Sequence, residues 1–303
     1  MNNRNQLQKR RTRMIEYAFL LPAVIFLCAF IIYPIVYNFI LSVHDIGLSF
    51  FKTRNYVFVG LENYIKMFTS PDRLLLNAMG NTLSFTIISI VFQVLISFSL
   101  ALFFHRPSRL SQFSRGVIVI AYILPQTVTG LVFKFIYMKD GGIINHLIMN
   151  LGLIDKPIGW LLQPNTAMAA IIASNLWIGI PFSMLLFTSG LTTVDPGYLE
   201  AAMIDGAGWW RRLFSIVIPS ISETIKIVLT LGFINTFKVF DMPVILTGGG
   251  PGASTEMLSM FSYKLSFTLN RYDDSAVVSN VLFVILLIVG LFYIRAVRSE
   301  GEV

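Results

Sequence analysis

The side chains that could carry out acid–base, nucleophilic or metal chemistry are scattered along this chain. His44, His105 and His146 fall at helix ends or in loops, and no two of them have metal-ligand spacing on one element. The carboxylates form no pair suited to general acid–base catalysis. The one glycine-rich run, TGGGPGAST, lacks the lysine followed by serine or threonine that a phosphate-binding loop needs. The residue types therefore predict no catalytic residue, no metal site and no ATPase site in this chain.

Uncharged polar and aromatic residues inside two apolar stretches fit two roles, and the pattern alone favours hydrogen bonding between helices over recognition of a sugar. Asn175, Trp177 and Phe182 lie in one stretch, and Asn235 and Thr236 lie in a later one. Amides and hydroxyls bond to the hydroxyl groups of a sugar, and aromatic faces cover its apolar C–H surface. Hydrogen bonding between membrane helices is the alternative use of Asn and Thr. Both interpretations place these side chains inside a helical bundle.

Charged residues within the apolar stretches are few. A charge at the middle of a membrane costs about 2.5 to 3.5 kcal/mol on insertion scales, so it usually faces a cavity or a partner. Lys238 and Asp241 are three residues apart, a spacing that predicts an ion pair on one helix face. Lys134 is expected to extend toward the headgroups. Such charges would be coupling sites in an ion-coupled secondary transporter, which is the alternative function.

The elements that position these residues are membrane-spanning helices. The 303 residues are 55% hydrophobic and 13% charged, with a mean hydropathy of +0.72, which predicts an all-α polytopic membrane protein. Since a spanning helix needs about 20 mostly apolar residues, six are expected, near 17–43, 77–104, 116–138, 166–190, 220–246 and 276–295. The first run is too long for a signal peptide, and Cys28 within it is expected to pack as a small hydrophobe.

The basic residues predict the orientation, and their position at helix ends argues against nucleic acid as a partner. Positive residues favour the cytoplasmic side. They precede the first helix, link the second to the third and follow the sixth, so both termini, the basic segment 1–16 and the segment 195–218 are expected in the cytoplasm. The links 44–76, 139–165 and 247–275 then face outward, mostly as solvated loops, with a short interfacial helix at GLENYIKMF.

The cytoplasmic segment contains EAAMIDGAGWWRRLFSIVIP, from Glu200 to Pro219. Asp195 followed by Pro196 predicts a helix start, because Asp caps the free N–H groups and Pro fits the first helical position. Gly206 and Gly208 are expected to end that helix. An interfacial helical hairpin is one interpretation of this segment.

EAAMIDGA, followed after about ten residues by Pro219, closely resembles the EAA loop of the membrane subunits of binding-protein-dependent ABC importers. The stretches NLWIGIPFSMLLFTSGLTTVDPGYLEAAMIDGAGWWRRLFSIVIPSI, FKVFDMPVILTGGGPGASTEMLSMFSY and ILPQTVTGLVFKFIY are similar to the carbohydrate-uptake, maltose-type branch of that family. The resemblance covers residues 80–295, the expected permease core of a single transmembrane domain over 1–303. The larger maltose-type subunit has extra N-terminal helices and an external insert that this chain does not share.

The resemblance implies a type I ABC importer permease fold. It implies a subunit that translocates a sugar or oligosaccharide by alternating access in the cell membrane of a bacterium or archaeon. The expected partners are two ATPase subunits, an extracellular solute-binding protein, the lipid bilayer and a second permease subunit, expected to be a paralogue although a homodimer stays open. No cofactor is expected on this chain, since ATP and Mg are used by the ATPase. A polytopic membrane enzyme is the remaining alternative.

The resemblance also implies residue roles, carried over position by position. The residues expected to couple to the ATPase are Glu200, Ala201, Ala202, Asp205, Gly206, Ala207 and Pro219. Those expected to contact the cargo are Ile178, Gly179, Phe182, Gly232, Asn235, Thr236 and Val239. The loop expected to face the binding protein contains Gly248, Gly249, Gly250 and Pro251; taken alone, this run predicts a flexible turn at a helix end.

Overall fold

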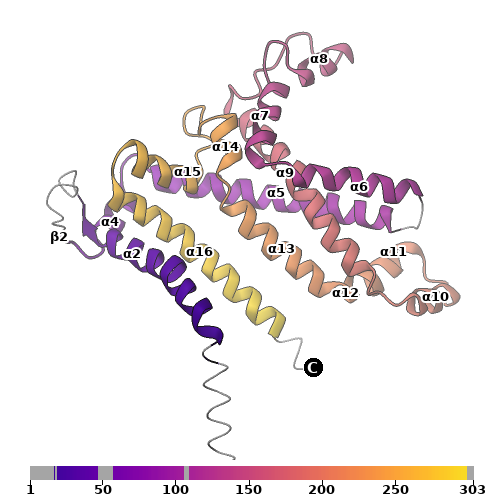
Figure 1. The fold of residues 1–303 in the computed structure, drawn as a ribbon. Helices are drawn as coiled ribbons and strands as arrows, with labels where there is room; N and C mark the ends of the chain where they lie inside the picture. Colours follow the sequence, from indigo (N-terminus) through magenta and orange to yellow (C-terminus); the bar gives the residue numbers. More distant parts are fainter. Residues whose placement is uncertain (1–16, 18, 47–56, 106–108, 299–303) are drawn as a thin grey trace, which may run out of the picture.

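Long apolar helices form the body of the chain in the computed structural model, which describes residues 17, 19–46, 57–105 and 109–298 (Figure 1). Four of them are long and apolar enough to cross a membrane: Phe19–Ser42, α5 (Leu74–Phe104), α9 (Pro164–Leu191) and the stretch Tyr272–Ala296 of α16 (Tyr272–Arg298). The first contains a π-helical turn, η1 (Cys28–Ile32), followed by α2 (Tyr33–Ser42). Two bent helix pairs bring the candidate spans to six if each pair counts as one. The basic segment 1–16 lies outside the described residues.

The third span is a broken helix rather than the continuous helix expected over 116–138. Helices α6 (Arg109–Ile123) and α7 (Gln126–Ile136) meet at a bend of 103°. Pro125 causes the break, because proline has no N–H to donate and disfavours helical geometry in the preceding residue. Its ψ of 137° turns the chain out of the helix.

The fifth span also departs from the continuous helix expected over 220–246. It begins with α11 (Trp209–Arg212), the π-helical turn η2 (Leu213–Val217) and α12 (Ile218–Ser220), bends by 71° and continues as α13 (Ser222–Phe237). A separate short helix, α14 (Asp241–Leu246), follows. A continuous helix would press the ring of Pro243 against the carbonyl of Val239, whereas the first turn of a new helix accepts proline.

The links expected to be solvated loops contain short elements that pack on the bundle. Strands β1 (His44–Asp45) and β2 (Val57–Phe58) pair antiparallel, and they are the only strands in the described part of the chain. Helices α4 (Glu62–Thr69) and α8 (Ile143–Asn150) follow the first and third spans. Between α14 and α16 lie α15 (Leu258–Tyr263) and the π-helical turn η3 (Lys264–Thr268). Here the loop expectation is wrong, because Thr255, Met257 and Leu258 are fully buried.

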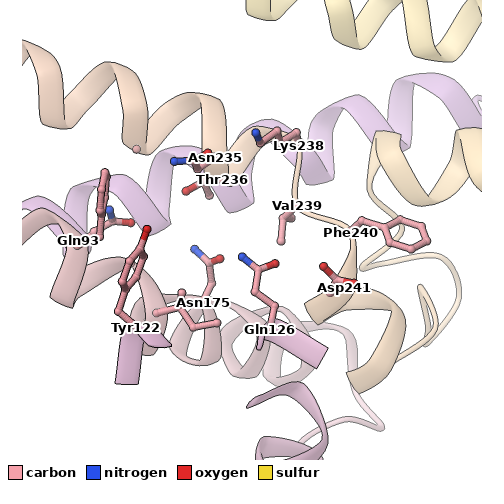
Figure 2. A pocket seen from close by; sticks show the side chains of 14 residues that line it. Gln93, Tyr122, Gln126, Asn175, Asn235, Thr236, Lys238, Val239, Phe240 and Asp241 are labelled. Atoms are coloured by element: carbon pink, nitrogen blue, oxygen red, sulfur yellow. The ribbon is translucent and has the colours of Figure 1, made fainter. Parts of the chain in front are cut away.

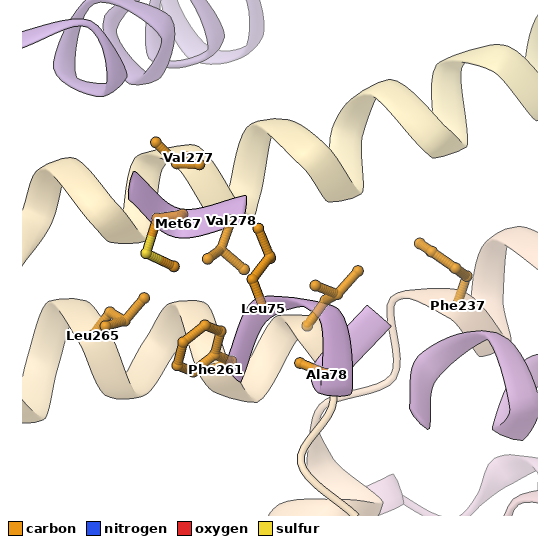
Figure 3. Packing of buried hydrophobic residues seen from close by; sticks show 9 residues of the cluster. Met67, Leu75, Ala78, Phe237, Phe261, Leu265, Val277 and Val278 are labelled. Atoms are coloured by element: carbon orange, nitrogen blue, oxygen red, sulfur yellow. The ribbon is translucent and has the colours of Figure 1, made fainter. Parts of the chain in front are cut away.

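Helix α5 contributes to all three hydrophobic clusters found among the described residues. Near its start, Leu75 and Ala78 pack with Val277 and Val278 of α16 (Figure 3). Phe85 joins the second cluster, which includes residues of α9 and α14. Near its end, Ala101 and Phe104 join a third cluster with Met184, Phe187 and Val228. Since lipid is as apolar as these side chains, close packing rather than removal from water favours the contacts.

The ends of the spans alternate between two sides of the molecule (Figure 1). The start of the first span, the end of α16 and helices α10 (Pro196–Ile204) to α12 lie toward one side. Helices α4, α8, α14 and α15 lie toward the other. This arrangement is the one that an even number of crossings produces.

Candidate functional site

A cavity of about 340 Å³ lies where α5, α6, α7, α9 and α13 meet (Figure 2). All the residues expected to contact cargo line it, although they come from two helices and the segment after α13. The complete lining is Gln93, Tyr122, Gln126, Asn175, Ile178, Gly179, Phe182, Gly232, Asn235, Thr236, Lys238, Val239, Phe240 and Asp241. The fold thus gathers the polar residues of the two apolar stretches around one space.

Neutral hydrogen-bonding groups face one another across this cavity. Gln126 and Asn175 lie on one side, and Asn235 and Thr236 lie on the facing side (Figure 2). Each amide offers donors and an acceptor, and the threonine hydroxyl offers both in one group. A molecule that carries many hydroxyl groups can satisfy such a lining without a net charge of its own.

Aromatic rings supply the apolar part of the lining. Tyr122 of α6 and Phe182 of α9 stack with their ring centroids 5.5 Å apart and their planes inclined by 21°. Phe240 lies beyond the end of α13. Stacked rings of this kind present extended π-faces and edges to a ligand that has apolar C–H surface.

Lys238 and Asp241 line the cavity separately, and the ion pair expected between them is wrong. Among the ion pairs of the described residues none joins the two side chains. Lys238 caps the end of α13 and Asp241 begins α14. Because the helix breaks between them, their spacing of three does not place them on a shared face.

The predicted cytoplasmic element is a short helix with defined caps at both ends. Asp195 Oδ1 accepts a hydrogen bond of 2.8 Å from the N–H of Gly197 at the start of α10. At its end, the N–H of Ala207 donates to the carbonyl of Ala202, and the N–H of Gly206 donates to that of Met203. This is a Schellman motif, and Gly206 has the positive φ, +74°, that the motif requires. The expected helix start and end are therefore both present.

Helix α10 has no buried residue and lies at the edge of the molecule, away from the bundle (Figure 1). The apolar side chains of Tyr198, Met203 and Ile204 are 66%, 50% and 87% exposed. Of the residues expected to couple to the ATPase, only Ala202 and Ala207 are half-buried; the others are exposed. A surface helix that exposes large apolar side chains is typical of a site that another protein or a membrane covers.

Hydrogen bonds hold the glycine-rich turn after α14. The N–H of Gly250 donates to the carbonyl of Thr247 at 3.1 Å, and the hydroxyl of Thr255 donates to the carbonyl of Gly250 at 2.7 Å. Asn81 Nδ2 of α5 donates to the carbonyl of Ala253 at 2.9 Å. Gly249 is buried, whereas Gly248 is exposed and Gly250 and Pro251 are half-buried. The turn lies with α14 on the side opposite α10 (Figure 1).

The model of the family described as binding-protein-dependent transport system inner membrane component matches residues 93–298. The chain belongs to this family. It is 32% identical to the probable ABC transporter permease protein YurN of Bacillus subtilis, over 96% of this chain and 99% of that one. It is 29% identical to the trehalose/maltose transport system permease protein MalF of Thermococcus litoralis, over 99% of both chains. The protein is thus a multi-pass membrane permease of an ABC importer.

A solved structure shows the same fold as this permease. A chain of a bacterial ABC transporter that imports the acidic polysaccharide alginate superposes with a TM-score of 0.80, at 22% identity, over 97% of the permease and 99% of that chain. A second structure of the bacterial alginate transporter, in complex with an alginate pentasaccharide-bound periplasmic protein, gives a TM-score of 0.78 at 21% identity, over 94% of both chains. The type I importer fold expected from the sequence is therefore confirmed.

Several residues that line the permease cavity had no predicted contact role. Tyr122 and Gln126 lie on either side of the break at Pro125. In the sequence, a proline followed by a polar residue within an apolar stretch could have indicated a broken helix that faces a cavity. Gln93 is a lone amide in an otherwise apolar run. The spacing of Lys238 and Asp241 predicts an ion pair between them and gives no sign of their place in the cavity. The described residues contain no group of three His, Cys, Asp or Glu side chains that could hold a metal ion.

Proposed function

We propose that this permease forms the membrane pathway for a sugar or oligosaccharide. The observation that carries the proposal is the cavity, in which neutral amides and a hydroxyl face one another beside two stacked aromatic rings. These groups match the hydroxyls and the apolar ring surface of a sugar. The names of the relatives, a trehalose/maltose permease and an alginate importer, support the same class of cargo.

The energy for transport comes from ATP hydrolysis on separate subunits. The sequence contains no phosphate-binding loop with its lysine, so ATP and Mg belong to the partner ATPase. Two such subunits dock on α10 and its counterpart in a second permease subunit, which we expect to be a paralogue. The exposed apolar face of α10 supports this role, because it supplies a contact surface that the bundle itself leaves uncovered.

The permease is oriented with both termini and α10 in the cytoplasm of a bacterial or archaeal cell. The turn at Gly248–Pro251 then faces outward, toward a solute-binding protein that delivers the cargo. The ordered geometry of that turn, held by Thr255 and Asn81, supports a docking role. The alginate transporter solved with its periplasmic protein is a relative in which such a complex exists.

Transport by alternating access exposes the cavity to one side at a time. ATP binding closes the two ATPase subunits, and α10 transmits that movement to the spans that line the cavity. An ion-coupled secondary transporter is the second candidate, because Lys238 and Asp241 both line the cavity and are not paired with each other. In that mechanism a proton or sodium gradient would drive uptake.

Uptake into proteoliposomes separates the two candidates. The vesicles contain the permease, its paralogue and the ATPase, and sugar-loaded binding protein is added outside. We expect uptake that requires ATP inside and that persists with an uncoupler. Uptake that an uncoupler abolishes and that ATP depletion leaves unchanged would establish the secondary transporter instead. Turnover of a sugar by the isolated chain would indicate a membrane enzyme.

A further inference from the structure

Gln93, in the middle of α5, is the polar side chain on which three of the cavity helices converge. It is only 3% exposed although it lines the cavity. Its Nε2 donates a hydrogen bond of 2.7 Å to the hydroxyl of Ser183, which is also buried, on α9. This bond links the amide on α5 to α9.

The amide occupies space that is open only because residue 179 is a glycine. A Cβ atom at Gly179 of α9 would lie 2.7 Å from Cδ of Gln93 and closer still to its Oε1, so no side chain fits there while the amide keeps its place. A Cβ atom at Gly232 of α13 would lie 3.6 Å from Nε2, an ordinary contact. The lack of a side chain at Gly179 is therefore required by Gln93 itself, independently of any cargo.

The hydrogen-bonding capacity of the amide is only partly used. A carboxamide has two N–H donors and an oxygen with two lone pairs. Ser183 accepts from one donor, and it is the only hydrogen-bond partner of this amide among the described residues. The remaining N–H and the carbonyl oxygen belong to a side chain that lines the cavity. A sugar hydroxyl both donates and accepts, so it matches this remaining pair.

We propose that Gln93 determines specificity for the transported sugar, by bonding one of its hydroxyls with an amide that Ser183 orients and that Gly179 accommodates. The proposal rests on the proposed function, since it names a contact within the same cavity. It changes the role expected for Gly179, because the missing side chain at this position makes room for the amide of Gln93.

Chemical analogues of the sugar test the contact directly. The full complex is reconstituted in proteoliposomes, and wild-type uptake is measured for labelled maltose, trehalose, maltotriose and an alginate trisaccharide. Monodeoxy analogues of the best-transported sugar are then compared. Binding protein is preloaded and saturating, so its own preference among sugars does not enter the rate. The variants are Gln93→Met, which keeps the length without the amide, and Ser183→Ala, which keeps the amide without its orienting partner.

We expect Gln93→Met to slow uptake of the parent sugar about tenfold, the effect of one to two lost neutral hydrogen bonds. The same variant should slow one monodeoxy analogue less than twofold, because that analogue lacks the hydroxyl that the amide binds. Ser183→Ala should show the same dependence on the analogue with a smaller loss, about threefold. Ser99→Ala is the matched control, since Ser99 is exposed on α5, bonds to the carbonyl of Leu95 and lies outside the cavity.

The outcomes distinguish this proposal from the proposed function. A wild-type complex that transports none of the sugars overturns both. If the wild-type complex transports sugar but Gln93→Met slows every analogue equally, the specificity role alone is overturned. A purely structural amide would affect all cargoes equally. If Gln93→Met does not assemble, Ser183→Ala decides: an unchanged preference among the analogues refutes the proposal.

Discussion

Replacing Gly206 with alanine tests whether the conformation of the α10 turn controls docking of the ATPase. Gly206 has a φ of +74° and closes the Schellman motif at the end of α10. An added Cβ would meet no atom within 4 Å, so the substitution creates no clash. Its whole effect comes from the backbone, because a residue with a Cβ is strained in the left-handed region.

The size of that strain sets the expected result. A left-handed conformation costs an L-residue other than glycine about 1 to 2 kcal/mol. If docking requires the observed turn, the apparent affinity falls with the population of that turn. At about 1.4 kcal/mol per factor of ten, Gly206→Ala should weaken the ATPase affinity about 5- to 30-fold.

Binding of the purified ATPase to the detergent-solubilised permease pair measures this affinity. Hydrolysis of ATP stimulated by sugar-loaded binding protein provides a second readout. Gly208→Ala is the matched control, since Gly208 has a φ of −63° and open space around an added Cβ. Gly206→Asn should recover part of the affinity, because asparagine tolerates the left-handed region better than alanine. Equal affinities for Gly206→Ala and Gly208→Ala would refute the reasoning.

Three further predictions concern orientation, cargo and stability. In a Cys28→Ser background, Trp209→Cys should react with an impermeant thiol reagent only from the cytoplasmic side, and labelling on intact cells would contradict the orientation. Asn235→Leu should slow uptake of the preferred sugar about fivefold, as expected for about 1 kcal/mol from one neutral hydrogen bond, and should change the preference between two competing sugars; unchanged selectivity would remove Asn235 from the site. Asn145→Ala should lower the free energy of unfolding by about 3 kcal/mol. Its buried amide bonds to Ile158, to Trp160 and to the backbone carbonyls of Met138 and Lys139. Unfolding in denaturant or the rate of proteolysis measures the loss. The exposed Asn150→Ala should have little effect, and equal losses for the two variants would argue against this bonded amide.

Prolines illustrate what the sequence could predict of the spans and what it could not. The apolar content of the chain locates the six stretches, but continuous helices were expected where Pro125 breaks the third span and where Pro243 lies in the first turn of the separate helix α14. Pro181 lies inside α9, which continues past it as one helix. Neighbouring helices can satisfy the backbone groups that a proline frees in a membrane helix. The residue type alone therefore does not separate a break from a tolerated position.

The coupling element could be predicted more fully than the cavity. Asp195 and Gly206 act on backbone groups a few residues away, so both caps are visible in the local sequence. Gln93 depends on Ser183 and Gly179, which lie in another span. A single amide lowers the mean hydropathy of a span only slightly, so a hydropathy profile does not reveal its role. Contacts of this kind become visible when the helices are packed together.

Helix α5 has a consequence for how the permease is synthesised, because its three clusters are completed at different times. The cluster at its end needs α13 and is complete with Val228. The middle cluster requires Met257, and the one at its start requires Val278 of the last helix. Until α9 is made, lipid cannot bond the amide of Gln93, since it offers no hydrogen bonds. The earliest point in synthesis at which each cluster can be complete therefore runs along α5 from its C-terminal end to its N-terminal end, opposite to the order in which α5 itself is synthesised.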